Sequence, residues 1–343
     1  MDVFYSAAHL QHHPPFEIFD GGEKVPNFEV PARAERILAA IKEKPWAHIQ
    51  PPLDFGLEVI LEVHDPAYLT FLQNAYRDWQ LAGTDAPYEK SALLPATFPP
   101  GRWRRIPSTL LGRAGYYMSD LSAPISEGTY QAALASANCA LSGAEAILAG
   151  AKAAFALCRP PGHHAGREFC AGYCYINNAA VAANWLSKHR STAILDIDYH
   201  AGNGTQDIFY RRADVPTISI HADPDFEYPY FSGYADETGE GDGTGYHRNF
   251  PLPTGTDDTR YLETLDQALE LIANFHPEAL VISAGMDLFE GDPLGKFKVT
   301  RQGIGKIGAG IAGLGLPALI VMEGGYNNSA LAENMLTFLE TFQ

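Results

Sequence analysis

The stretch Ala193-Ile-Leu-Asp-Ile-Asp-Tyr-His-Ala-Gly-Asn-Gly204 begins with apolar residues and then presents two aspartates and a histidine. An apolar run without polar alternation is typical of a strand that is covered on both faces of a sheet. The charged residues that follow mark the edge where this burial ends. The stretch therefore predicts a strand of a parallel sheet with functional groups at its carboxyl end.

Similar apolar runs recur along the chain, and segments with apolar residues at helical spacing separate them. The expected strands are residues 3–5, 154–158, 192–195, 216–220, 279–283 and 318–322, and the expected helices are residues 130–149, 177–189, 259–275 and 301–313. This alternation predicts an α/β fold of three layers, α/β/α, around a central, mostly parallel sheet. Because no linker or repeat divides the 343 residues, we expect a single domain over residues 1–343.

The composition disfavours several classes of protein. The N-terminus lacks the features of a signal peptide and no apolar run could span a bilayer, so we expect a cytoplasmic protein without a membrane partner. Four cysteines are too few for a disulfide framework in a chain of this length. A formal net charge of −17 disfavours nucleic acid as a partner and favours cations.

Residues 82–107 break the pattern of strands and helices, because they contain many prolines and no sustained periodicity. Loops of this length are usually functional or disordered. The segment contains Phe98, Trp103 and the arginines Arg102, Arg104 and Arg105. Aromatic residues and arginine are enriched at protein interfaces, so we expect a subunit contact or a lid.

Polar side chains follow several of the expected strands directly. The carboxyl ends of parallel strands share one edge of the sheet, so these side chains should converge. In chain order they are His163, His164, Asp196, Asp198, His200, Ser219, His221, Asp287, Glu323 and Tyr326. A single Asp or His in such a place is more often a helix cap or a hydrogen-bonded core residue, but their joint occurrence favours a site.

Asp196, Asp198 and His200 stand at alternate positions of an extended chain, so their side chains can point into one volume. Buried carboxylates without partners are costly, and a bound cation removes that cost. Two carboxylates and one imidazole form a three-ligand site with an open position, as expected of catalytic zinc. The same ligands also suit iron(II), cobalt or manganese, so the residues alone leave the metal open.

Five motifs together resemble those of the arginase–deacetylase fold and its histone-deacetylase-like members. They are PPGHH (160–164), DIDYHAGNGTQ (196–206), SIH (219–221), GMD (285–287) and EGGY (323–326). The resemblance is closest to the bacterial acetylpolyamine amidohydrolases, through RPPGHH, NGTQDIFY, the EGGY ending and the insertion near residues 82–107. It implies a roughly eight-stranded sheet, and a homodimer in which the insertion makes the subunit contact and narrows the substrate channel.

By position, the resemblance implies that Asp198, His200 and Asp287 bind one catalytic zinc ion. It makes His164 the general base and then the general acid, with His163 as its electrostatic partner. Tyr326 is the residue expected to donate a hydrogen bond to the oxyanion.

Asp196 and Asn203 are implied as the acceptors that orient His163 and His164, respectively. Because Asn203 is neutral where some relatives have an aspartate, it should leave His164 less basic. Ala201 is a departure, since relatives usually carry a histidine there.

The resemblance also implies structural potassium, a hard cation that prefers oxygen ligands. The first set of residues is Asp196, Asp198, His200, Ser219 and Ile220, and the second is formed by carbonyls of Phe209, Arg212, Val215 and Tyr246.

For the substrate, Tyr173 and Tyr228 match the aromatic pair that lines the acetylated chain. Glu17 matches an acidic residue near the mouth that attracts a remote ammonium, and Arg33 a residue of an inner channel for acetate. The expected reaction is zinc-dependent hydrolysis of acetylated polyamines, such as acetylputrescine or acetylcadaverine, to the free amine and acetate.

Three alternatives stay open. The first is a lysine deacetylase that acts on acetylated peptides or proteins. The second is a binuclear manganese ureohydrolase of the arginase type, which would need further aspartates and histidines to bridge two metals. The third is a catalytically inactive binder, against which the retention of His163, His164 and Tyr326 argues.

Overall fold

The computed structural model describes residues 1–82, 90–99 and 105–343. Its centre is an eight-stranded sheet in the order β10-β9-β8-β11-β12-β7-β1-β4, and every neighbouring pair is parallel. The strands are β1 (Asp2–Phe4), β4 (His48–Gln50), β7 (Ala153–Ala156), β8 (Thr192–Asp196), β9 (Thr217–Ala222), β10 (His247–Leu252), β11 (Ala279–Ala284) and β12 (Ala318–Met322). The predicted α/β class and the six predicted strands are confirmed.

Within the eight-stranded sheet, the sequence pattern missed two strands, β4 and β10, which form its edges. An edge strand is less covered than a central one, and its sequence is accordingly more polar. In β4, His48 and Gln50 are exposed, and in β10 Arg248 is exposed. An apolar run was therefore absent at both places.

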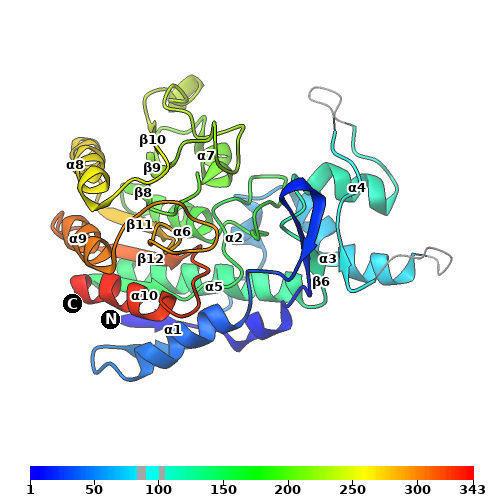
Figure 1. Ribbon diagram of the computed structural model, residues 1–343, viewed down its shortest axis with the longest axis horizontal. Coiled ribbons are helices and arrows are strands. Elements are labelled where there is room, and N and C mark those ends of the chain that lie inside the picture. Colours follow the sequence, from blue (N-terminus) through cyan, green and yellow to red (C-terminus); the bar gives the residue numbers. More distant parts are fainter. Residues whose placement is uncertain (83–89, 100–104) are drawn as a thin grey trace.

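Helices cover both faces of the sheet (Figure 1). One face packs against α5 (Thr129–Leu148) and α6 (Asn178–Ser187), and the other against α1 (Ala32–Lys42), α8 (Asp258–Phe275), α9 (Arg301–Ala312) and α10 (Leu331–Leu339). Alternate residues of one strand serve the two layers: Leu319 packs toward α5, whereas Ile320 belongs to the opposite core. The three-layer prediction and all four predicted helices are confirmed.

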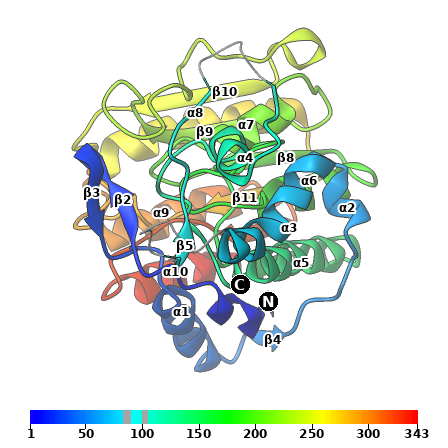
Figure 2. The same cartoon turned by 90° about the vertical axis from the view of Figure 1, so that its right-hand side faces the viewer.

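Smaller elements gather at the end of the long axis opposite α8 and α9, and Figure 2 looks onto this end. They include α3 (Pro66–Leu81), α4 (Leu110–Tyr117) and the antiparallel pair β2 (Glu17–Phe19) and β3 (Glu23–Val25). The remaining described helices are α2 (Glu58–Leu61), α7 (Asn203–Phe209) and the short 3₁₀ helices η1 (Ala7–Gln11), η2 (Asp20–Gly22), η3 (Gly241–Gly243) and η4 (Glu340–Phe342). Within the described ranges, none of the helices combines the length and apolar character that a membrane crossing requires.

Of the insertion at residues 82–107, the structure describes Ala82, residues 90–99 and residues 105–107. The insertion contains the short strand β5 (Ala92–Leu93), which pairs antiparallel with β6 (Ile125–Ser126). Lys90, the first described residue after Ala82, contacts the end of α3, because its Nζ donates to the carbonyl of Trp79 at 2.8 Å and lies over the Trp79 ring. Arg102, Trp103 and Arg104 fall outside the described residues.

The order of the strands explains why distant parts of the sequence form one site. β9, β8, β11, β12 and β7 are consecutive neighbours in the sheet. Each of them ends immediately before, or within, one of the polar motifs. The carboxyl ends of parallel strands lie on one edge, so the motifs are placed side by side.

The central position of β12 makes its packing sensitive to truncation. Leu319 is fully buried, and α5 approaches it so closely that a Cβ on Gly143 would lie 2.4 Å from its Cδ1. We expect Leu319→Ala to lower the free energy of unfolding by about 2–5 kcal/mol, because it leaves a cavity in the core. Urea denaturation is the measurement, with Leu81→Ala as the control, since Leu81 is 75% exposed. Equal unfolding midpoints for the two variants would contradict this packing.

Candidate active site

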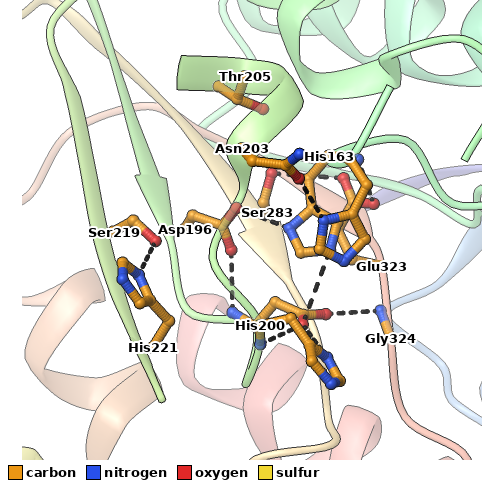
Figure 3. Close-up of polar contacts among 12 residues, drawn as sticks. His163, Asp196, His200, Asn203, Thr205, Ser219, His221, Ser283, Glu323 and Gly324 are labelled. Carbon is orange, nitrogen blue, oxygen red and sulfur yellow. Dashed lines mark hydrogen bonds and ion pairs between the residues drawn. The ribbon is translucent and has the colours of Figure 1, made fainter. Parts of the chain in front are cut away.

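The loops at the carboxyl edge of the sheet surround one cavity of about 640 Å³. His164, His200 and Tyr326, from the loops after β7, β8 and β12, line it together. Figure 3 shows His163, Asp196, His200, Asn203 and Glu323 converging from these separate segments. The predicted convergence is therefore what the structure has.

Asp198, His200 and Asp287 form a candidate metal centre, since one ligand atom of each lies within 4.8 Å of the others. His200 Nδ1 lies 3.2 Å from Asp287 Oδ2 and 3.4 Å from Asp198 Oδ1. Backbone N–H groups hold the other carboxylate oxygens: Gly324 donates to Asp198 Oδ2 at 2.8 Å, and Tyr199 donates to Asp287 Oδ1 at 3.0 Å. Each carboxylate is thereby fixed with one oxygen turned toward His200.

The chemistry of these three residues fits a divalent cation. Asp198 and Asp287 are fully buried, and burial together with the charge of Asp198 raises the pKa of Asp287 to about 7. A bound cation would favour the charged form of both carboxylates. Glycines make room for this cluster, because a Cβ on Gly285 would lie 1.9 Å from Asp198 Oδ2 and one on Gly324 would lie 2.2 Å from Asp287 Oδ2.

His163 carries a partner on each ring nitrogen. Its Nδ1 donates to Asp196 Oδ2 at 2.9 Å, and its Nε2 lies 3.7 Å from Asp198 Oδ1. Although burial opposes protonation, the carboxylates of Asp198 and Asp196 raise the pKa of His163 well above its usual range. The geometry thus favours a positively charged imidazole and agrees with the predicted contact to Asp196.

His164 is in the opposite electrostatic state. Its Nδ1 donates to Asn203 Oδ1 at 2.7 Å, which leaves Nε2 as the acceptor nitrogen. Burial, reinforced by the charges of His163 and His200, lowers the pKa of His164 well below its usual value. Neighbouring histidines whose pKa values are pushed apart in this way are suited to two roles, one as a base and one as a fixed charge.

Tyr326 reaches the cavity from a loop that is fastened on both sides. Asp292 Oδ2 accepts a hydrogen bond from the Tyr326 backbone N–H at 2.7 Å. Arg33 donates to the carbonyls of Gly325 and Glu323 at 2.7 and 2.6 Å, and its guanidinium lies 4.7 Å from the centre of the Tyr326 ring. Burial raises the pKa of Tyr326 well above its usual value, so its hydroxyl keeps its proton and can donate it in a hydrogen bond.

Tyr173 and Tyr228, the two residues expected to contact the acetylated chain, both line the cavity. The rings of Tyr228 and His164 meet edge to face, with centroids 4.9 Å apart. Glu17 is different, because it is fully buried and lies behind Tyr173, accepting hydrogen bonds from the Tyr173 hydroxyl at 2.8 Å and from Phe28 N at 3.0 Å. The expected position of Glu17 at the mouth is thus corrected: it supports the wall of the cavity rather than facing its opening.

Sequence reasoning missed Asp120, which lines the cavity. Its Oδ2 accepts hydrogen bonds from the Tyr228 hydroxyl and from Gly172 N, both at 2.7 Å. These partners are far away in the chain, and Asp120 follows no expected strand, so no local pattern pointed to it.

Glu323 stands in the EGGY motif, and its carboxylate holds the backbone that carries the two histidines. Its Oε2 accepts hydrogen bonds from Gly162 N at 2.7 Å and from His163 N at 3.1 Å.

The first set of residues expected around potassium shares Asp198 and His200 with the candidate metal centre. Asp196, the last residue of β8, is the register partner of Ser219 within β9. Ser219 Oγ lies 2.6 Å from His221 Nδ1, a contact drawn in Figure 3. In the second set, the carbonyl of Phe209 accepts hydrogen bonds from Arg212 N at 2.8 Å and from His247 Nε2 at 2.7 Å. Potassium at either set stays a prediction.

Ala201 has a steric explanation. It is buried, and the backbone of Gly233 passes so close that a Cβ there would lie 2.7 Å from Cβ of Ala201 and 2.8 Å from His221 Nε2. His221 Nε2 already donates to the carbonyl of Gly233 at 2.8 Å. A small residue at position 201 therefore suits this arrangement of His221 and Gly233.

Comparison with known proteins agrees with this geometry. Residues 27–342 match the family described as Histone deacetylase domain. The chain is 47% identical over 344 residues to acetylpolyamine amidohydrolase 1 of Pseudomonas aeruginosa, covering 99% of this chain and 98% of that protein. It is 46% identical to the acetylpolyamine amidohydrolase of Mycoplana ramosa over 99% of both. The crystal structure of acetylpolyamine aminohydrolase from Burkholderia pseudomallei superposes with a TM-score of 0.94 and 40% identity, covering 100% of this chain and 98% of that one.

The contact between Asn203 and His164 gives a direct test of the electrostatics. Asn203→Asp places a negative charge beside Nδ1, which stabilises the imidazolium, so the pKa of His164 should rise by about one unit or more. NMR titration of the His164 ring measures this shift, and Asn74→Asp, on α3, supplies the same charge change elsewhere. If both variants leave the His164 titration where the wild type has it, Asn203 does not control this histidine.

Proposed function

This chain belongs to the histone deacetylase domain family, and we propose that it hydrolyses the acetyl amide of small acetylated polyamines to the free amine and acetate. The observation that carries the proposal is the single cavity on which His164, His200 and Tyr326 meet. A base, a metal-ligating residue and a hydroxyl donor around one volume are the groups that amide hydrolysis requires. Relatives named for acetylpolyamines match the chain over almost its full length.

Asp198, His200 and Asp287 would hold one zinc ion, which when bound acts as a Lewis acid and makes water a nucleophile near neutral pH. His164, kept neutral by burial, takes the proton of the attacking water at Nε2. The same nitrogen then gives the proton to the departing amine. His163, held by Asp196, contributes a fixed positive charge beside the reacting atoms.

Tyr326 stabilises the charge that develops on the acetyl oxygen. Its hydroxyl keeps its proton at neutral pH and can donate a hydrogen bond into the cavity. Arg33 and Asp292 hold the backbone of Gly325 and Tyr326, respectively. The Tyr326 hydroxyl is therefore already positioned in the free protein to donate to the developing oxyanion. Arg33 and Asp292 act as positioning residues for Tyr326.

The walls of the cavity suit a short cationic chain. Tyr173 and Tyr228 offer aromatic faces to its methylene groups and, near its end, to an ammonium. No lysine or arginine stands among the described residues that line the cavity, whereas Asp120 and Glu227 do. The net charge of −17 would also attract a polycation.

Further parts of the proposal come from the sequence and the family resemblance. They are structural potassium at the two sets of residues named above, a cytoplasmic location, and a homodimer in which the insertion makes contact and narrows the channel. Phe98, within the insertion, lines the cavity and so supports the narrowing.

Two of the alternatives lose support. The other cluster of possible metal ligands within the described residues, His163, Cys174 and Glu323, contains a thiol, and manganese prefers oxygen ligands. Its Glu323 already accepts two backbone hydrogen bonds, which argues against a binuclear manganese centre. The intact set of His163, His164 and Tyr326 argues against an inactive binder.

Substrate choice is tested by measuring kcat/KM for N-acetylputrescine, N-acetylcadaverine and an acetyl-lysine peptide with the zinc-loaded protein. We expect both acetylated diamines to be preferred over the peptide, because a narrow cavity without cationic side chains favours a small ammonium. Preference for the peptide would instead identify a lysine deacetylase.

Tyr326→Phe shows whether the turnover comes from this cavity. Loss of an oxyanion donor typically lowers kcat by about 10²–10³-fold. Tyr76→Phe, on α3, is a matched control with the same loss of a hydroxyl. Unchanged deacetylation by Tyr326→Phe would exclude the proposed role.

A further inference from the structure

Glu227 occupies an unusual place on the cavity wall. It immediately precedes Tyr228, whose ring meets His164 edge to face, and it lines the same cavity. Its side chain is only 10% exposed, yet its partner is the ammonium of Lys296, which is 59% exposed and lies 2.6 Å from Glu227 Oε1. A nearly buried carboxylate is therefore paired with an alkylammonium that reaches it from the solvent side.

Two other carboxylates near the cavity, those of Asp120 and Glu17, have a different kind of hydrogen-bond donor. Asp120 accepts hydrogen bonds from Tyr228, Gly172 and Ser122, and Glu17 from Tyr173 and Phe28. All these donors are neutral and belong to the wall itself. Glu227 differs from both, because its carboxylate accepts a hydrogen bond from the cationic side chain of Lys296.

The main chain at both ends of the ion pair is well anchored. Glu227 N donates to the carbonyl of Asp223, and the carbonyl of Lys296 accepts from Gly255 N at 2.9 Å. Leu294, two residues before Lys296, lines the cavity, and its backbone N–H donates to the side chain of Asp292. The flexible part is the lysine side chain, whose four methylenes can swing away while the carboxylate stays in place.

We infer that Glu227 is the subsite for the distal ammonium of the substrate, and that Lys296 fills it when no substrate is bound. The ammonium of Lys296 and that of an acetylated diamine are the same chemical group, a primary alkylammonium at the end of a methylene chain. A substrate ammonium that enters from the cavity can take over the contact with Glu227 while Lys296 moves into solvent. This inference rests on the proposed function and specifies how its substrates are recognised.

Exchange of one ammonium for another keeps the carboxylate paired throughout. An unpaired carboxylate at this depth would be costly, and Lys296 removes that cost in the free protein. The same exchange makes the site selective, since a neutral acetamide cannot replace Lys296 at Glu227. Glu227 and Lys296 are accordingly specificity-determining residues rather than catalytic ones.

The test compares N-acetylcadaverine with its neutral isostere N-hexylacetamide on the zinc-loaded full chain. Glu227→Gln should raise KM for N-acetylcadaverine by at least about tenfold, the usual size of a lost charge-assisted hydrogen bond, and leave kcat and the neutral substrate nearly unchanged. Lys296→Met should lower KM for N-acetylcadaverine only, because it removes the competing ammonium.

Glu263→Gln on α8 and Lys306→Met on α9 carry the same charge changes on exposed surface and should alter neither substrate. If Glu227→Gln or Lys296→Met changes both substrates by the same factor, the ion pair only fastens the loop and the inference is wrong. If the wild type turns over neither compound, the proposed function itself fails, and the two failures are thereby distinguished.

Discussion

The burial of Asp198 and Asp287 is the constraint on which the rest of this structure depends. Both carboxylates are fully buried at the carboxyl edge of neighbouring strands, with a single imidazole between them. Their charge is the reason for much of the nearby architecture: backbone N–H groups hold one oxygen of each, and glycines let the main chain approach to contact distance. A cation that takes the remaining oxygens would complete a cluster that is costly without one.

The same negative charge gives the tandem histidines, His163 and His164, opposite shifts in pKa. The carboxylates of Asp198 and Asp196 raise the pKa of His163, whereas burial and the charge of His163 lower the pKa of His164. Two identical side chains, adjacent in sequence, thus receive opposite roles from the carboxylates around them. Asn203 preserves this difference because it orients His164 without adding charge.

Much of this could be predicted from the sequence, since the central strands are continuous apolar runs and the polar motifs come directly after them. The edge strands β4 and β10 could not, because partial exposure makes their residues polar. Asp120 and the contact between Glu227 and Lys296 also left no local pattern, as their partners are distant in the chain. The sequence did point to Glu17 as a residue of the site, but its burial behind Tyr173 depends on packing that motif spacing does not encode.

The proposed amide hydrolysis requires a mononuclear zinc centre formed by Asp198, His200 and Asp287. The most direct test is the metal content of the purified protein by mass spectrometry, combined with hydrolysis of N-acetylputrescine before and after chelation and after re-addition of zinc. We expect one zinc per chain, loss of turnover on chelation and its return with zinc. Two manganese ions per chain, or full turnover without metal, would contradict it.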